Sequence, residues 1–129
     1  MPTSWREPNA ARWVGVRPAH NGEQIALEVA ATNAIVIVYT VPAGKVLYLV
    51  EAMLWSLNNS GIKKLYIRDA ADAMWRHLCY IVALSAAGVP NADHWNAWPP
   101  LEVPAGYDVC VSGSAAGITG NGAIFGWVE

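Results

Sequence analysis

The tetrapeptide Val-Pro-Ala-Gly occurs twice in this chain, at residues 41–44 and 103–106, and each copy is followed at once by a strand-like run. Proline presets φ for the first corner of a turn, and glycine can supply the positive φ that a type II turn requires. The runs that follow, residues 45–51 and 107–112, are patterned like half-buried strands. Two equal turns that lead into two similar strands predict two related corners of one antiparallel β-sandwich.

Other runs rich in Ile and Val are separated by Gly, Pro and Asn, which is typical of short strands joined by turns. We expect strands at residues 23–30, 34–40, 45–57, 62–68, 107–112 and 123–128, with turns at 58–61 and 119–122. In the strand at 62–68 we expect the basic side chains to face solvent: Lys63, Lys64 and Arg68. With about eight short strands in all, the predicted fold class is all-β, an antiparallel two-sheet β-sandwich of jelly-roll type.

Residues 73–84 fit two structures. Met74, Leu78 and Ile81 have the spacing of a helical stripe, whereas Tyr80-Ile81-Val82 favours a strand, as do the neighbouring segments. We favour the strand, and its two faces would then both be largely apolar. A sandwich strand normally has one face in the core and one polar face in solvent. Here a partner subunit or a loop would cover the second apolar face. We assign Trp75 and Ile81 to this oligomer interface.

The chain is poor in charge, which also favours self-association. Charged residues make up 14% of it and hydrophobic residues 54%, with a mean hydropathy of +0.25, whereas soluble domains average about 25% charged residues. A surface so poor in charge predicts burial against other copies. A membrane span is not expected, because no apolar run approaches about 18 residues. The net charge of −2 argues against a nucleic-acid partner.

The first twenty residues differ from the rest in composition. They are rich in Pro, Arg and Trp and lack strand periodicity, so we divide the chain into an N-terminal arm, 1–20, and a β-sandwich domain, 21–129. They also lack the pattern of a secretory signal. Aromatic and arginine side chains anchor many interfaces, and we expect Trp5, Arg6, Arg12 and Trp13 to bind a partner. The alternative is a strand that completes the edge of the sandwich.

No catalytic motif is present, and we predict a non-enzymatic protein. Nucleophile elbow, phosphate loop, dinucleotide fingerprint and zinc-protease motif are all missing. No cofactor and no metal site are expected, because the two cysteines lack a CxxC spacing and the three histidines are scattered. Cys79 and Cys110 are expected to be buried free thiols. A disulfide stays open, since it requires the two strands to be neighbours.

We expect residues 88–100 to be a long irregular segment, and it concentrates tryptophan and polar groups. Trp95 and Trp98 are accompanied there by Asp93 and His94. Aromatic faces beside amide and carboxylate groups are suited to sugars, which stack on rings and accept directed hydrogen bonds. We therefore consider a glycan site at these four residues. The alternative, which we favour, is that the tryptophans plug one end of the sandwich or pack on a neighbouring subunit.

The order of these signals resembles a known group of proteins. Val41-Pro42-Ala43-Gly44-Lys45 with its strand, Asn58-Asn59-Ser60-Gly61, Ile67-Arg68-Asp69, Pro100-Leu101-Glu102-Val103-Pro104-Ala105-Gly106 and the closing Asn121-Gly122-Ala123-Ile124-Phe125-Gly126-Trp127 resemble small jelly-roll virion proteins of tailed bacteriophages. The resemblance covers residues 35–129, and the closing strand is also similar to trimeric jelly rolls of the tumour-necrosis-factor type.

The resemblance implies a structural role. Such modules serve as head decoration, fibre-head or tail components and are usually trimers. We therefore expect a homo-oligomer, with a trimer favoured, that binds a capsid or tail surface in a virion assembled in the host cytoplasm. A carbohydrate- or receptor-binding tip module that uses Trp95 and Trp98 is the alternative.

Overall fold

The computed structural model describes residues 22–31, 35–56, 61–83, 91–113 and 120–129. These residues form eight strands in chain order: β2 (Glu23–Ala31), β3 (Val36–Thr40), β4 (Leu47–Ser56), β5 (Gly61–Arg68), β6 (Met74–Ala83), β7 (Asn91–Val103), β8 (Asp108–Gly113) and β9 (Gly120–Val128). The predicted arm with Trp5, Arg6, Arg12 and Trp13 lies outside the described residues, as do most of the predicted turn at 58–61 and residues 84–90.

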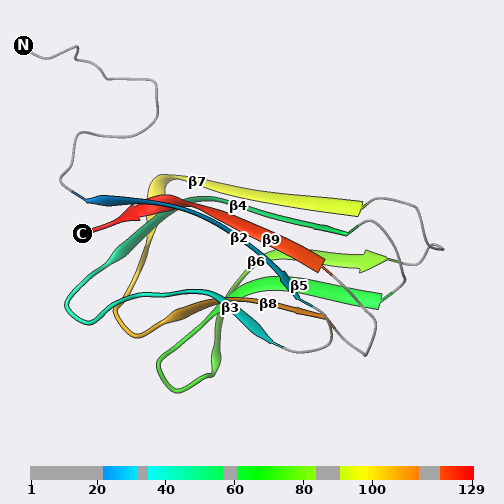
Figure 1. The fold of residues 1–129 in the computed structure, drawn as a ribbon, viewed down its shortest axis with the longest axis horizontal. Helices are drawn as coiled ribbons and strands as arrows, with labels where there is room; N and C mark the ends of the chain where they lie inside the picture. Colours follow the sequence, from blue (N-terminus) through cyan, green and yellow to red (C-terminus); the bar gives the residue numbers. More distant parts are fainter. Residues whose placement is uncertain (1–21, 32–34, 57–60, 84–90, 114–119) are drawn as a thin grey trace, which may run out of the picture.

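The strands form two stacked four-stranded sheets (Figure 1). One sheet has the order β2-β9-β4-β7 and the other β3-β8-β5-β6, and all neighbours pair antiparallel. This is the strand order of a jelly roll, in which successive strands repeatedly change sheet. The predicted antiparallel β-sandwich is confirmed.

The core lies between the two sheets. On β4, side chains at Leu47, Leu49, Ala52 and Leu54 point inward and are fully buried. They meet the inward side of the other sheet, which includes Leu65, Ile67, Val109 and Val111. Burying such aliphatic side chains contributes about 1.5–3 kcal/mol each to the free energy of unfolding, and this packing sets which face of each strand remains available to a partner.

The two Val-Pro-Ala-Gly segments are corners at the same end of the sandwich. The first joins β3 to β4 and the second joins β7 to β8, so each carries the chain from one sheet to the other. They lie side by side, because the Val41 N–H donates to the Tyr107 carbonyl at 2.9 Å and the Gly106 N–H donates to the Val41 carbonyl at 2.9 Å. The predicted pair of related corners is confirmed.

Both corners use the same turn. The Lys45 N–H donates to the Pro42 carbonyl, and the Tyr107 N–H donates to the Pro104 carbonyl. Gly44 and Gly106 then occupy the third position of each turn with φ of 75° and 84°, as a type II turn requires. The expected positive φ is therefore confirmed. The proline lies one position earlier than expected, at the start of the turn.

The ambiguous segment 73–84 contains strand β6, so the favoured alternative is confirmed. The simple alternation expected for it is wrong, because two bulges interrupt the pairing of β5 with β6. One extra residue, Leu78, lies between the partners of Leu65 and Tyr66, and a second, Trp75, lies between those of Ile67 and Arg68. A bulge shifts the inward-outward pattern by one residue, and Leu78 and Cys79 are therefore both buried although they are adjacent.

The expected loop at 88–100 is wrong over most of its length, because residues from Asn91 onward belong to β7. This strand contains two prolines, Pro99 and Pro100. They are accommodated because β7 is an edge strand, which among the described strands pairs with β4 alone, and prolines are tolerated at the edge of a sheet. The register with β4 shifts at this point, between Leu49 and Glu51, and the Trp98-Pro99 peptide bond is cis.

Two smaller expectations also need correction. Lys63 does not face solvent: it pairs with Ile81 and Gly113 on the inward side and is fully buried. The expected turn at 119–122 is largely strand, because β9 begins at Gly120. Gly122 has no room for a side chain, since a Cβ there would overlap the Val111 side chain of the facing sheet.

Candidate interaction surfaces

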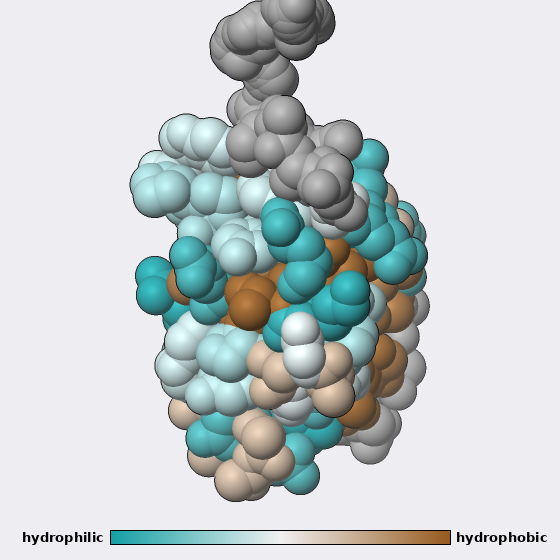
Figure 2. Space-filling model, turned by 90° about the vertical axis from the view of Figure 1, so that its left-hand side faces the viewer, coloured by the Kyte–Doolittle hydropathy of each residue, from teal (hydrophilic) through white to brown (hydrophobic). Residues whose placement is uncertain are grey.

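Exposed apolar side chains are the most distinctive surface feature of the described chain. Ten large apolar residues are exposed there, and all but two of them lie at the two lateral edges of the sandwich. Figure 2, which looks at the end with the two corners, shows apolar atoms along one side of the molecule beside a largely polar rim. Among the described residues, no three His, Cys, Asp or Glu side chains lie close enough to hold a metal ion.

The first surface is the β2/β3 edge, which we define as Glu23 and Leu27 of β2 with Ile35 and Ile37 at β3. β2 and β3 are the outermost strands of their sheets on the same side of the sandwich, and they approach each other there. Leu27 pairs with inward-facing Ile124. It is nevertheless exposed, because β2 is the outermost of the described strands in its sheet. Ile37 faces outward from the second sheet and is 44% exposed.

The second surface is the β6/β7 edge, on the opposite side, which we define by these residues: Met74, Trp75, Arg76, His77, Tyr80, Val82 and Trp98. Trp98 is 60% exposed and Val82 is 49% exposed. The Trp75 ring lies edge-on to Tyr107, with centroids 5.1 Å apart. The two strands are tied together by Asp93, whose carboxylate accepts the Tyr80 N–H at 2.9 Å.

The third surface is the outer face of the β2-β9-β4-β7 sheet. Tyr48 and Trp127 stack there with ring centroids 5.3 Å apart, and the Trp127 indole N–H donates to the Glu129 carboxylate. His94 Nε2 lies 2.7 Å from Glu51 Oε2. Of the described residues, only Met53 and Phe125 are large, apolar and exposed on this face. The Tyr48–Trp127 rings and the Glu51–His94 pair are thus engaged within the chain itself.

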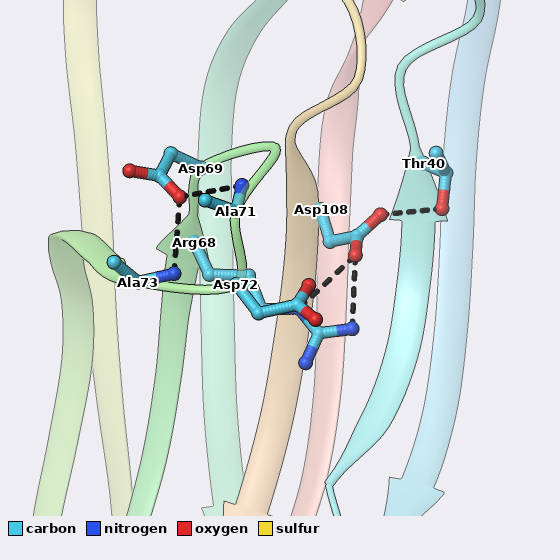
Figure 3. A network of polar contacts seen from close by, with 7 residues as sticks. All are labelled: Thr40, Arg68, Asp69, Ala71, Asp72, Ala73 and Asp108. Atoms are coloured by element: carbon cyan, nitrogen blue, oxygen red, sulfur yellow. Dashed lines mark hydrogen bonds and ion pairs between the residues drawn. The ribbon is translucent and has the colours of Figure 1, made fainter.

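A polar network braces the other sheet near the corners (Figure 3). The Arg68 guanidinium donates to Asp108 through both Nε and Nη2 at 3.0 Å, and the Thr40 hydroxyl donates to the same carboxylate at 2.6 Å. This hydrogen bonding raises the pKa of Arg68. Asp69 accepts the N–H groups of Ala71 and Ala73 and closes the β5–β6 turn. The network joins β3, β8 and β5. Its contacts hold the sheet together, and we assign it a structural role.

The two cysteines are free and buried, as predicted. Cys79 pairs with inward-facing Leu65, whereas Cys110 pairs with outward-facing Tyr66, so the two thiols point to opposite sides of their sheet. Burial raises the pKa of Cys79 to about 12 and that of Cys110 to about 11. Since the thiolate is the nucleophile, neither thiol is activated for chemistry.

The four residues of the expected glycan site do not form one site. Trp95 pairs with Ala52 on the inward side of the sheet and packs against the core, while Trp98 is exposed at the edge. His94 points to the outer face beside Glu51, and Asp93 is engaged by Tyr80. Adjacent residues of a strand point to opposite faces of the sheet. In a loop, these four side chains could have pointed the same way.

The expected oligomer interface needs one correction. Trp75 is exposed at the β6/β7 edge, but Ile81 is only 6% exposed and belongs to the hydrophobic core. The bulge at Leu78 turns Ile81 inward. The apolar surface of this strand is instead provided by Tyr80 and Val82.

The β2/β3 edge was missed in the sequence. Its signal was available, because Ile35, Val36, Ile37 and Val38 form an apolar run without a wet face. As in the strand at 73–84, two apolar faces on a sandwich strand predict that a partner or a loop covers one of them.

Comparison with protein families, curated proteins and solved structures finds no match to this chain. In the described residues there is no helix long and apolar enough to cross a membrane. The surfaces of the fold therefore carry the functional argument.

Proposed function

We propose that this protein is a non-enzymatic structural protein that works as a homo-oligomer, and that it serves as a decoration or attachment module on the capsid or tail surface of a virion. The observation that carries the proposal is the exposure of large apolar side chains along both lateral edges of the sandwich. Contiguous apolar surface on a small soluble domain usually marks a protein interface.

The low charge of the chain supports the same conclusion. With 14% charged residues, the chain has few groups with which to keep an isolated domain soluble, and burial of its edges against other copies relieves this deficit. A trimer is the favoured state, in keeping with the resemblance to trimeric jelly rolls.

The virion setting rests on the resemblance in turns and strands described above. A jelly roll is used by viral capsid proteins as well as by lectins and cupins, and a fold does not by itself determine a function. The capsid or tail partner is assigned to the N-terminal arm, with Trp5, Arg6, Arg12 and Trp13 as its anchors.

The glycan-binding alternative receives less support from the geometry. Trp95 packs against the core, so of the two tryptophans of that expected site only Trp98 is exposed. A sugar platform generally needs directed polar groups around the ring, and Asp93 is engaged with the backbone of β6.

Native mass spectrometry of the purified chain tests the oligomer. We expect a discrete assembly, with a trimer favoured, at micromolar concentration, and a stable monomer would overturn the proposal. Peptide mass spectrometry of particles purified from the strain that encodes the chain tests the virion setting, since a structural component should remain with the particles through a density gradient.

A further inference from the structure

We propose that copies of this chain join edge to edge, with the β2/β3 edge of one copy against the β6/β7 edge of the next, so that the assembly is a closed ring. This inference rests on the proposed self-assembly and specifies the surfaces that carry it.

The topology supplies the first argument. β2 and β3 end their sheets on one side of the sandwich, and β7 and β6 end them on the other. A contact between these two different surfaces is heterologous, and each copy then has one surface of each kind to offer. Heterologous contacts repeat from copy to copy and generate a ring when the rotation closes.

The distribution of exposed apolar groups supplies the second argument. Leu27, Ile35 and Ile37 provide aliphatic surface on one edge. The opposite edge offers the larger aromatic groups Trp75, Tyr80 and Trp98. Aromatic side chains packed on aliphatic ones are typical of the buried centre of an interface.

The charges supply the third argument. The β2/β3 edge carries the exposed carboxylate of Glu23, and the β6/β7 edge carries the exposed guanidinium of Arg76. Among the described residues, neither Glu23 nor Arg76 makes an ion pair within its own copy. Opposite charges on two matching surfaces favour their association and disfavour contact of like edges.

The backbone indicates that side chains rather than added strands make this contact. β6 carries two bulges, β7 carries Pro99 and Pro100, and Asp93 already accepts the Tyr80 N–H. Bulges, prolines and charges of this kind prevent strand pairing at a sheet edge. The neighbouring copy therefore packs on the side chains of this edge.

The test uses two variants of the full chain, each with one damaged edge. Ile37→Glu damages the β2/β3 edge, and Val82→Glu damages the β6/β7 edge. Each should raise the dissociation constant of the assembly by at least about tenfold, because an unpaired carboxylate is strongly unfavourable in an apolar interface. Met53→Glu is the matched control, since Met53 is exposed on the outer sheet face, and it should leave the mass of the assembly unchanged.

Mixing the two damaged variants gives the decisive result. Each retains the edge that the other lacks, so the mixture should form a one-to-one heterodimer while each variant alone is monomeric in native mass spectrometry. A mixture that stays monomeric would overturn the inference, and so would a single variant that keeps the wild-type mass. Dissociation by Met53→Glu alone would assign the interface to the sheet face instead. A monomeric wild-type chain would instead overturn the proposed function itself.

A charge exchange keeps the inference testable if an apolar variant fails to fold. Glu23→Arg and Arg76→Glu alter exposed side chains only, as circular dichroism melting should verify. Each alone should weaken assembly up to about fivefold, as expected for a peripheral ion pair, and the double variant should recover the wild-type constant. Equal weakening in the single and double variants would contradict the proposed pairing of the edges.

Discussion

Gly44 and Gly106 show how one residue can fix a corner between two sheets. Both have positive φ, a conformation in which a β-branched side chain is strained. A Cβ at Gly44 would meet open space, whereas one at Gly106 would contact the Ala70 side chain at 3.5 Å. Backbone strain is thus the main restriction at Gly44, and packing against the β5–β6 turn adds to it at Gly106.

Gly44→Val should therefore lower the free energy of unfolding by about 1–2 kcal/mol, and Gly106→Val by at least as much. Urea denaturation measures both. Ala43→Val and Ala105→Val are matched controls, because they place the same side chain one position earlier in each turn without positive φ. If the glycine variants were as stable as these controls, positive φ would not be required at the corners.

The two thiols allow a second prediction at this scale. With pKa values of about 12 and 11, Cys79 and Cys110 have thiolate fractions at pH 8 of only about one in ten thousand and one in a thousand. Native protein should react with a disulfide reagent such as Ellman's reagent far more slowly than denatured protein, in which both thiols react. Ala70→Cys adds an exposed thiol as a positive control. Rapid reaction of two thiols in the native wild-type chain would contradict their burial.

Lys63 and Gly122 show that the position of a residue in the fold can differ from what its residue type suggests. A lysine in a strand favours solvent, yet Lys63 lies on the inward side because β5 alternates and Leu65 and Ile67 face the core. Gly122 belongs to a pattern typical of a turn, yet it allows β9 to approach Val111 of the facing sheet. Both outcomes depend on neighbours distant in sequence.

Among the elements, β8 depends on a polar bridge to its two neighbours, which gives the third prediction. Asp108→Asn should lower the free energy of unfolding by about 1–3 kcal/mol, because hydrogen bonds from a charged donor to this little-exposed carboxylate are lost. Asp72→Asn is the control: Asp72 lies 3.3 Å from the same guanidinium but is 70% exposed, so its charge should contribute about 0.5 kcal/mol or less. Asparagine also tolerates the positive φ of Asp72. Equal effects in urea denaturation would contradict a special role for Asp108.

At the scale of the elements, the sequence predicted which segments are strands more readily than which side chains of each strand face the core. Ile and Val content indicated β2, β3 and β4, but no local pattern marks the bulges in β6 that turn Ile81 into the core. The edge position of β7 likewise decided that a segment with two prolines could be a strand. A bulge or an edge position depends on which strands pair with each other. That pairing is decided by the whole sheet and not by the local sequence.

At the scale of the molecule, the repeated corner motif was the feature that predicted the architecture. Two equal corners imply that two chain segments cross between sheets in the same way, and the structure places them side by side. The candidate site was less predictable. Trp75 was recognised as exposed surface, but the β2/β3 edge emerges only when two strands become outermost on the same side.

The remaining prediction concerns the N-terminal arm, which we propose attaches the assembled sandwich to its particle. The described residues from Ile25 to Val128 supply a hydrophobic core, and the two edges assigned to self-assembly lie among the described residues as well. Deleting residues 1–12 should therefore leave the melting temperature and the oligomer mass close to those of the full chain. Binding to the particle should be lost, because aromatic and arginine side chains are frequent anchors of an interface.

The substitutions Trp5→Ala and Trp13→Ala, made together in the full chain, separate loss of anchors from loss of chain length. They should abolish co-sedimentation with particles as the deletion does, while circular dichroism and native mass spectrometry remain unchanged. If the truncated chain precipitates or melts at a much lower temperature, residues 1–12 contribute to the core. If it folds but becomes monomeric, the arm holds the copies together, and the lateral edges are not sufficient for assembly.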